Sequence, residues 1–297
     1  MKNVLYFFLL LLYSVNISAQ DDMSEEPTGL PGDNFSLEGA LELFKNASSP
    51  EDFEKSLNSK DNHVNNIDLD GDGEIDYIRV ISKQNDDVHI FVLQVAVSES
   101  ENQDIAVIEL EKKGNEEAVL QIIGDEDIFG EEIIVEPSSG EDDDEGNSKG
   151  PSSSFSRSAI IVNVWGWPSV RYVYSPVYRP WISPWRWRSY PNWWSPWRPF
   201  SWSVWRPFRV NHYRPTIRIV NTHRVVRAHG IYKPLRVTSS TVRVRHSGAH
   251  ANYKVNRTKT KVTGPKGNSV TKKTTTVKGP KGNVRGQKTT VKKSRRG

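Results

Sequence analysis

The chain has 297 residues, no cysteine and ten tryptophans, and its ionisable side chains nearly cancel to a formal charge of +4. The lack of cysteine excludes a disulfide framework, a lipidated cysteine and a cysteine nucleophile. The two halves of the chain carry opposite net charges. All 36 acidic residues lie at or before Glu145, whereas only nine of the 40 Lys and Arg lie within residues 1–150. This separation of charge indicates a partner whose charges are all of one sign, or contact between the two halves within or between molecules.

The first residues have the pattern of a secretory signal peptide. Lys2 precedes an apolar run, Val4 to Tyr13, that ends in small and polar residues. This run is too short for a comfortable membrane span. We therefore predict a signal peptide over residues 1–19 and a polar leader over 20–34, and we expect an exported protein of the periplasm, the outer membrane or the extracellular space.

Residues 35–137 predict a small acidic α+β domain. Leu37, Leu41 and Phe44 have helical spacing, and Ser49 followed by Pro50 is a helix start. Stretches rich in β-branched residues and separated by Asp, Asn and Gly predict strands at residues 63–69, 75–82, 88–97, 104–111, 117–124 and 131–137. The expected fold is two helices packed against an antiparallel β-meander.

The sequence DLDGDGEID within this domain has the spacing of a calcium loop. Its candidate ligands, at loop positions one, three, five, seven and nine, are Asp68, Asp70, Asp72, Glu74 through its backbone carbonyl, and Asp76. Gly73 supplies the sharp turn. The loop resembles those of EF-hands, dockerins and thrombospondin type 3 repeats, which implies bound Ca²⁺. Arg79 replaces the bidentate Glu of an EF-hand, so we expect weak affinity, on the order of 10⁻⁴ to 10⁻³ M, with the missing ligand from water or from acids near Asp125. The alternative is an Asp/Gly-rich turn that binds nothing.

The segment from the first helix to Pro137 is also similar to a set of uncharacterised secreted proteins of the Bacteroidetes. The carrying motifs are VNNIDLDGDGEIDYIRV, FVLQVAVSESENQDIAVIELE and VLQIIGDEDIFGEE, together with the Ala-Gln that ends the apolar leader. The resemblance covers about a third of the chain. It implies an envelope location and no enzymatic activity.

An acidic Ser/Gly linker is predicted over residues 138–158, followed by a Trp/Pro/Arg-rich region over 159–208 that holds all ten tryptophans. Residues 159–165 and 170–178 have strand patterns, and eight prolines favour extended backbone over a long helix. The tract resembles indolicidin-type antimicrobial peptides, which implies contact with anionic surfaces. The candidate anionic-surface residues are Trp181, Trp185, Arg186, Trp187, Arg188, Trp193, Trp194, Trp197, Arg198, Trp202, Trp205 and Arg206. The alternative is a folded aromatic cap over a β-sheet.

Residues 209–297 form a basic tail rich in Val, Thr, Lys and Arg. Stretches such as 240–246 alternate like strands, and the motif GPKGN occurs at residues 264–268 and 279–283. Few large apolar residues are present, so we expect this low-complexity region to be partly β or disordered. Its lack of acids favours polyanion binding, including self-association with the acidic domain of another copy.

No catalytic motif is present. The seven histidines are scattered, and the pair His246 and His250 lacks a third ligand for zinc. We therefore predict an exported, non-enzymatic envelope protein with a Ca²⁺-binding head and a basic aromatic region that binds an anionic envelope polymer or membrane surface. The alternatives are a protein that binds single-stranded nucleic acid, although export disfavours nucleic acid as a partner, and a carbohydrate-modifying enzyme.

Overall fold

The computed structural model describes residues 27–138, 161–213, 217–263, 269–278 and 284–294. The predicted signal peptide, nearly all of the acidic linker and both GPKGN motifs lie outside these ranges.

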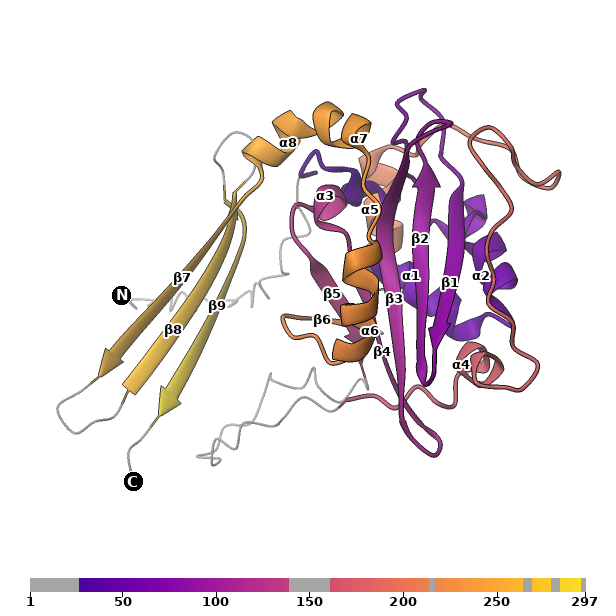
Figure 1. The fold of residues 1–297 in the computed structure, drawn as a ribbon. Coiled ribbons are helices and arrows are strands. Elements are labelled where there is room, and N and C mark those ends of the chain that lie inside the picture. The colour runs from indigo at the N-terminus through magenta and orange to yellow at the C-terminus, as the bar shows by residue number, and fades with distance from the viewer. Residues whose placement is uncertain (1–26, 139–160, 214–216, 264–268, 279–283, 295–297) are drawn as a thin grey trace, which may run out of the picture.

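A six-stranded antiparallel sheet organises the molecule, and its strands neighbour one another in chain order (Figure 1). The strands are β1 (Ile78–Asn85), β2 (Val88–Ala96), β3 (Asn102–Gly114), β4 (Glu117–Gly124), β5 (Ile133–Pro137) and β6 (Ile217–Val220). The first five come from the acidic half and the sixth from the basic half. The prediction of a mixed α+β fold with an antiparallel meander is confirmed, and the meander continues into the basic half.

Two N-terminal helices, α1 (Leu37–Asn46) and α2 (Pro50–Leu57), begin where the sequence indicates. Ser36 Oγ accepts a hydrogen bond from Gly39 N at 2.9 Å, and Ser49 Oγ accepts one from Asp52 N at 3.1 Å. These caps satisfy backbone donors that an isolated helix start leaves free.

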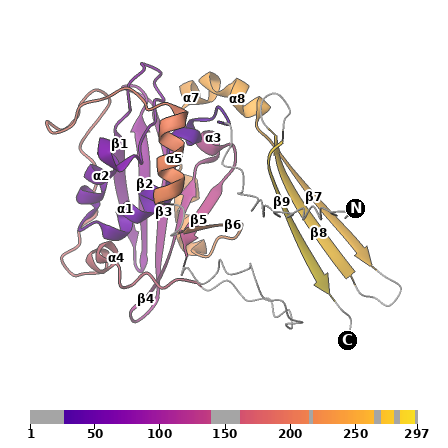
Figure 2. The ribbon, with the colours of Figure 1, turned by 180° about the vertical axis from the view of Figure 1, so that it is seen from behind.

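Alternating side chains of the strands form two apolar clusters, one on each face of the sheet. Phe91 and Leu93 of β2 pack in the cluster that includes α1 and α2, whereas Ile90 and Val92 pack in the cluster that includes α6 (Val226–Tyr232). Figures 1 and 2 show α1 and α2 behind the sheet and α6 in front of it, and the reverse from the other side. The basic half contributes to both clusters: Val164, Val170, Val173, Tyr178, Tyr213 and Val242 join the first, and Val225, Ala228 and Tyr232 join the second.

Short helices and a second sheet complete the described chain. The helices are η1 (Pro31–Asn34), η2 (Lys60–Asn62), α3 (Glu126–Phe129), α4 (Pro168–Val173), α5 (Trp202–His212), η4 (Lys233–Leu235), α7 (Ser240–Arg245) and α8 (Ser247–Asn252). The second sheet is antiparallel and contains β7 (Lys254–Thr263), β8 (Ser269–Lys278) and β9 (Val284–Ser294).

The predicted strand at residues 63–69 is wrong. This segment makes one isolated bridge, between Phe35 and Asn65, because its asparagines hydrogen-bond backbone groups of other segments. Asn65 Nδ2 donates to the carbonyl of Asp76 at 2.8 Å, and Asn66 Nδ2 donates to that of Phe200 at 3.1 Å. These bonds replace a strand ladder.

Three strand patterns in the basic half are also wrong. Residues 161–165, the described part of the predicted strand at 159–165, form no strand. Residues 170–178 begin within α4, where Pro168 occupies the first turn, and residues 240–246 form α7 and its C-terminal end. Ser239 Oγ accepts from Val242 N at 3.2 Å and starts α7. Helix starts and burial of one face therefore override the β-propensity of valine in these short segments. Eleven residues of the proline-rich region and its continuation form α5, with Pro207 inside.

Candidate functional site

Three carboxylates of the predicted calcium loop come together. One oxygen each of Asp68, Asp70 and Asp76 lies within 4.8 Å of the other two. Gly71 and Gly73 turn the backbone with φ of 73° and 86°, which glycine adopts without strain. Asp68 accepts hydrogen bonds from both glycine N–H groups, at 2.7 and 3.0 Å. The loop is therefore folded around its first aspartate.

The electrostatics of this group favour a cation. Asp76 is 6% exposed, and burial raises its pKa well above the ordinary value, with the nearby charges of Asp70 and Asp68 raising it further. Burial also raises the pKa of Asp70. In the part of the chain that the structure describes, no Lys or Arg forms an ion pair with these three carboxylates. A divalent cation would offset both the desolvation and the repulsion.

The carboxylate of Asp72 is not part of this group, and the predicted role of Glu74 through its backbone carbonyl stays a prediction. Asp72 is exposed and its Oδ1 accepts from Glu74 N at 2.9 Å. Arg245 of α7 donates to the carbonyl of Leu69 and lies beside Gly71, so one positive charge is near the loop without pairing a carboxylate. The three-carboxylate set consists of hard oxygen donors and fits Ca²⁺ by its chemistry.

The Trp-rich segment, residues 161–208, is mostly packed against the sheet domain. Of the ten tryptophans, only Trp193 is exposed, at 50%. Trp194, Trp205 and Arg206 are buried. Of the other predicted surface residues, Trp181, Trp185, Trp187, Trp197 and Trp202 are half-buried, and Arg186, Arg188 and Arg198 are exposed. The alternative of a folded aromatic cap therefore describes much of this segment.

Backbone pairing fixes the segment to β1, the edge strand of the sheet. Ser82 N donates to Trp181 O at 2.7 Å, Ser183 N donates to Val80 O at 3.1 Å, and Ile182 makes a β-bridge with Ile81. Exposed strand edges template unwanted pairing with other chains. The Trp-rich segment covers part of this edge.

A buried carboxylate, Glu54 of α2, joins the two halves. It is 2% exposed and accepts four hydrogen bonds: from Tyr77 Oη at 3.0 Å, Val80 N at 2.8 Å, Trp181 Nε1 at 3.0 Å and Ser183 Oγ at 2.9 Å. Burial raises the pKa of Glu54, and these bonds oppose the rise. The sequence gives no signal for this role, because Trp181 is 127 residues away.

A surface groove with a volume of about 390 Å³ lies between α2, the turn after it and the Trp-rich segment. Its lining residues are Lys55, Asn58, Ser59, Lys60, Trp193, Trp194, Ser195, Pro196 and Trp197. Lys55 Nζ lies 5.6 Å from the ring centroid of Trp193. This Trp–Lys groove combines aromatic faces with two cations, and its volume falls within the range of about 300–1,000 Å³ usual for ligand pockets. Sequence reasoning identified its tryptophans and missed its lysines.

Ion pairs within the chain connect the oppositely charged halves. Arg236 binds Asp125 through two nitrogens at 2.5 and 2.9 Å, and Arg218 and Arg224 both bind Glu136, at 2.6 and 2.8 Å. Several basic residues therefore find their anionic partner in the first half of the same molecule.

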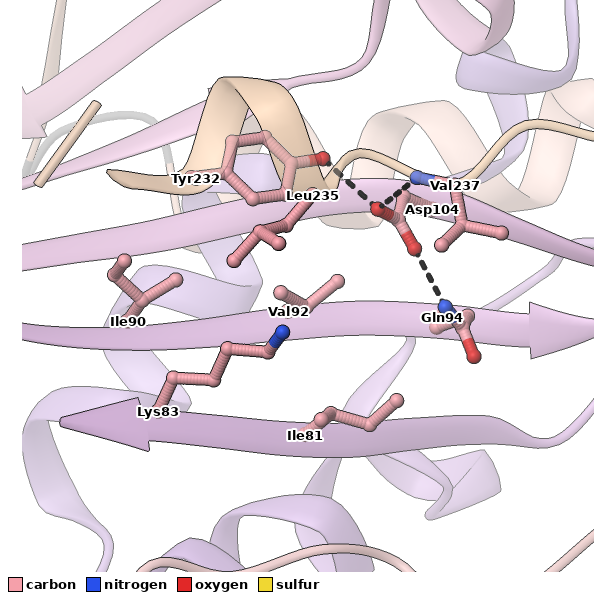
Figure 3. Close-up of a pocket in the computed structure, with 9 residues that line it drawn as sticks. All are labelled: Ile81, Lys83, Ile90, Val92, Gln94, Asp104, Tyr232, Leu235 and Val237. Carbon is pink, nitrogen blue, oxygen red and sulfur yellow. Dashed lines mark hydrogen bonds between the residues drawn. The ribbon is translucent and has the colours of Figure 1, made fainter. Parts of the chain in front are cut away.

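A smaller pocket, of about 90 Å³, lies between the sheet and the segment after α6 (Figure 3). Asp104 borders it and accepts hydrogen bonds from Tyr232 Oη at 3.1 Å, Val237 N at 2.9 Å and Gln94 Nε2 at 2.7 Å (Figure 3). These hydrogen bonds engage both oxygens of the Asp104 carboxylate. The volume of the pocket is well below the lower limit of about 300 Å³ usual for ligand pockets. This pocket is a packing feature between α6 and the sheet.

Comparison of the chain with protein-family models, curated proteins and solved structures finds no match. None of the helices that the structure describes has the length and apolar character needed to cross a membrane.

Proposed function

We propose that the protein is an exported, non-enzymatic calcium-binding module whose Trp–Lys groove binds an anionic polymer of the cell envelope. The groove is the observation that carries the proposal. Aromatic faces of Trp193 and Trp197 pack against rings or apolar faces of a ligand, and Lys55 and Lys60 attract its negative charges. Arg186, Arg188 and Arg198 of the same segment are exposed and add to its positive charge.

The burial of the tryptophans favours a polymer over a membrane surface as the partner. Interfacial membrane binding requires several aromatic side chains free to enter the headgroup region. Here Trp193 is exposed, while Trp194 and Trp205 are buried in the protein. A groove that presents one exposed ring and two lysines suits a chain of anionic sugars better than a lipid surface.

Calcium has a supporting role in the proposal. Trp187 Nε1 lies 3.4 Å from Asp70 Oδ2, and Ile75 N donates to Trp197 O at 2.8 Å. The loop thus contacts the Trp-rich segment at Trp187, which precedes the groove tryptophans, and at Trp197, which lines the groove. A cation held by Asp68, Asp70 and Asp76 would stiffen the loop and, through these contacts, the groove.

Binding to lipopolysaccharide, single-stranded DNA and neutral dextran at matched salt tests the polymer proposal. We expect the full chain to bind lipopolysaccharide, to bind less as salt rises, and to ignore dextran. Trp193→Ala and the double variant Lys55→Ala, Lys60→Ala should each weaken binding by about tenfold or more, because one ring or two charges are lost. Lys45→Ala, on α1 and away from the groove, is the matched control. Stronger binding to DNA than to lipopolysaccharide would support the nucleic-acid alternative instead.

Thermal unfolding with Ca²⁺ and with chelator tests the metal proposal separately. We expect Ca²⁺ at millimolar concentration to raise the Tm of the wild-type chain and to leave that of Asp70→Asn unchanged. Asp72→Asn should respond as the wild type does, because Asp72 lies outside the carboxylate group. Equal melting temperatures of the wild type with and without Ca²⁺ would reject the metal site while leaving the groove untouched.

A further inference from the structure

Two histidines and a glutamate from distant parts of the chain meet beside α6. Glu109 lies in β3, His223 in the turn after β6, and His229 in α6, and one ligand atom of each lies within 4.8 Å of the other two. His229 Nδ1 is 3.0 Å from Glu109 Oε1, and the two imidazole rings are 4.0 Å apart, centroid to centroid. A second carboxylate, that of Glu132, lies with Oε2 at 3.5 Å from His223 Nε2.

Two atoms of this cluster are buried without a partner. Glu109 is 0% exposed, and within the described chain no donor lies within hydrogen-bond distance of its Oε2. His223 Nδ1 is also buried without a hydrogen-bond partner in the described chain. A buried carboxylate oxygen and a buried imidazole nitrogen both lose their hydrogen bonds to water, and such atoms are rarely left unpaired. A bound cation would satisfy both atoms at once.

We propose that Glu109, His223 and His229 bind a transition-metal ion of the zinc class. The donor set has two imidazoles and one carboxylate, which suits Zn²⁺ and its neighbours in the first transition row and disfavours Ca²⁺ and Mg²⁺, whose sites use oxygen ligands. Glu132, beside Nε2 of His223, would orient that imidazole from its far side.

The present separations are compatible with such a site. Ligand atoms on tetrahedral zinc, with bonds of about 2.0–2.2 Å, lie about 3.3–3.6 Å apart. Glu109 is fixed in the sheet, whereas the side chain of His223 is 28% exposed and belongs to a turn, so closing the remaining gap requires rotation at the periphery. The metal would tie the turn and α6 of the basic half to β3 of the acidic half.

Metal titration of the chelator-treated full chain tests this proposal with Zn²⁺ and Co²⁺ as probes. We expect one Co²⁺ per chain with the visible absorption of a low-coordinate site, and displacement of that absorption by Zn²⁺ but not by Ca²⁺. Zn²⁺ in hundredfold excess over its Kd should raise the Tm by about 5 °C.

The variants Glu109→Gln, His223→Ala and His229→Ala should each lower the affinity for Zn²⁺ by at least about tenfold. His212→Ala, an exposed histidine on α5, and Asp70→Asn should leave it unchanged. If Glu109→Gln is unstable, His223→Ala still decides the question, because His223 lies at the rim. Absence of Zn²⁺ binding, or equal affinity of the wild type and His223→Ala, would overturn the proposal and leave Glu109 and His229 as a hydrogen-bonded structural pair.

Discussion

Residues 27–138 and residues 161–253 belong to one folded body, but different kinds of interaction determine their structures. The first region is a run of local elements, in which each strand pairs with the next along the chain. The second region has shorter elements and is positioned by contacts to residues far away in the chain, such as Trp181 with Glu54, 127 positions apart, and Arg224 with Glu136, 88 positions apart. Apolar alternation specifies the first region, whereas buried polar contacts position the second.

The comparison also explains the split of charge. Two buried acids of the first region form ion pairs with arginines of the second: Asp125 pairs with Arg236, and Glu136 pairs with Arg218. Partly buried, two-point arginine pairs are stronger and less screened than exposed pairs. Association between copies through these charges stays a prediction, and the pairs within one chain compete with it.

The largest effect is expected from Trp205→Ala. Trp205 is 0% exposed, and its Nε1 donates to Asp33 O at 3.0 Å, so its removal leaves a cavity between α5 and the N-terminal turn. We expect a loss of about 3–5 kcal/mol in the free energy of unfolding. Trp193→Ala, at the exposed ring, should lose less than about 1 kcal/mol. Equal losses in chemical denaturation would mean that the Trp-rich segment is not packed as described.

Glu54→Ala should follow, with a loss of about 3 kcal/mol. The change leaves four donors, from Tyr77, β1 and the Trp-rich segment, without their acceptor, and two of them are N–H groups of the Val80 backbone and the Trp181 indole. Glu51→Ala, exposed on the same helix, is the control. A wild-type Tm for Glu54→Ala would show that the carboxylate does not hold the two regions together.

Acid should weaken the contact between β2 and the Trp-rich segment through His89. This side chain is 1% exposed, packs edge-on against Tyr174 and Tyr178, and has a pKa that burial lowers from 6.5 to about 4. Unfolded chains take up a proton below pH 6.5 while the folded chain does not, so stability falls as the pH drops from 6.5 toward 4, by a total on the order of 3 kcal/mol. His89→Leu should flatten this part of the stability profile. An unchanged slope in that variant would assign the acid sensitivity elsewhere.

The smallest effect is expected at Glu101, which anchors the start of α7. Hydrogen bonds from Ser239, Ser240 and Thr241 lower the pKa of Glu101 to about 2. The stabilisation is complete above the ordinary value of 4.5 and is lost as the pH falls toward 2. Amide exchange in residues 240–245, corrected for intrinsic rates, should therefore be faster at pH 3 than at pH 5. Glu101→Gln should remove this difference; persistence of the difference would contradict the anchoring role.

Much of the first region follows from the sequence. Ser49 with Pro50 predicts α2, and β-branched alternation predicts five of the strands, because caps and period-two patterns act within a few residues. The Asp-x-Asp-x-Asp-Gly spacing identifies the loop, but Asp72 lies outside the three-carboxylate group. Asp76, at the end of the motif, joins that group through the fold of the loop.

The second region was predicted less well, and the reason is physical. Valine alternation in residues 240–246 indicates a strand, yet the Ser239 cap and burial of Val242 produce a helix. The groove combines residues from both regions, and so does the cluster of Glu109, His223 and His229. No spacing within one region predicts either site. Sites built from residues so far apart in the chain cannot be predicted from patterns within short stretches of sequence.

Hydrogen exchange of the full chain tests most directly whether the basic, aromatic region is part of the sheet domain. Val164 N donates to Ala118 O at 3.0 Å, and Ser183 N donates to Val80 O at 3.1 Å. We expect these two amides to exchange as slowly as the central amides of β2 and β3, and to lose protection together with them in denaturant. Exchange of Val164 and Ser183 at the rate of an unfolded peptide, while β2 and β3 stay protected, would contradict a single folded body.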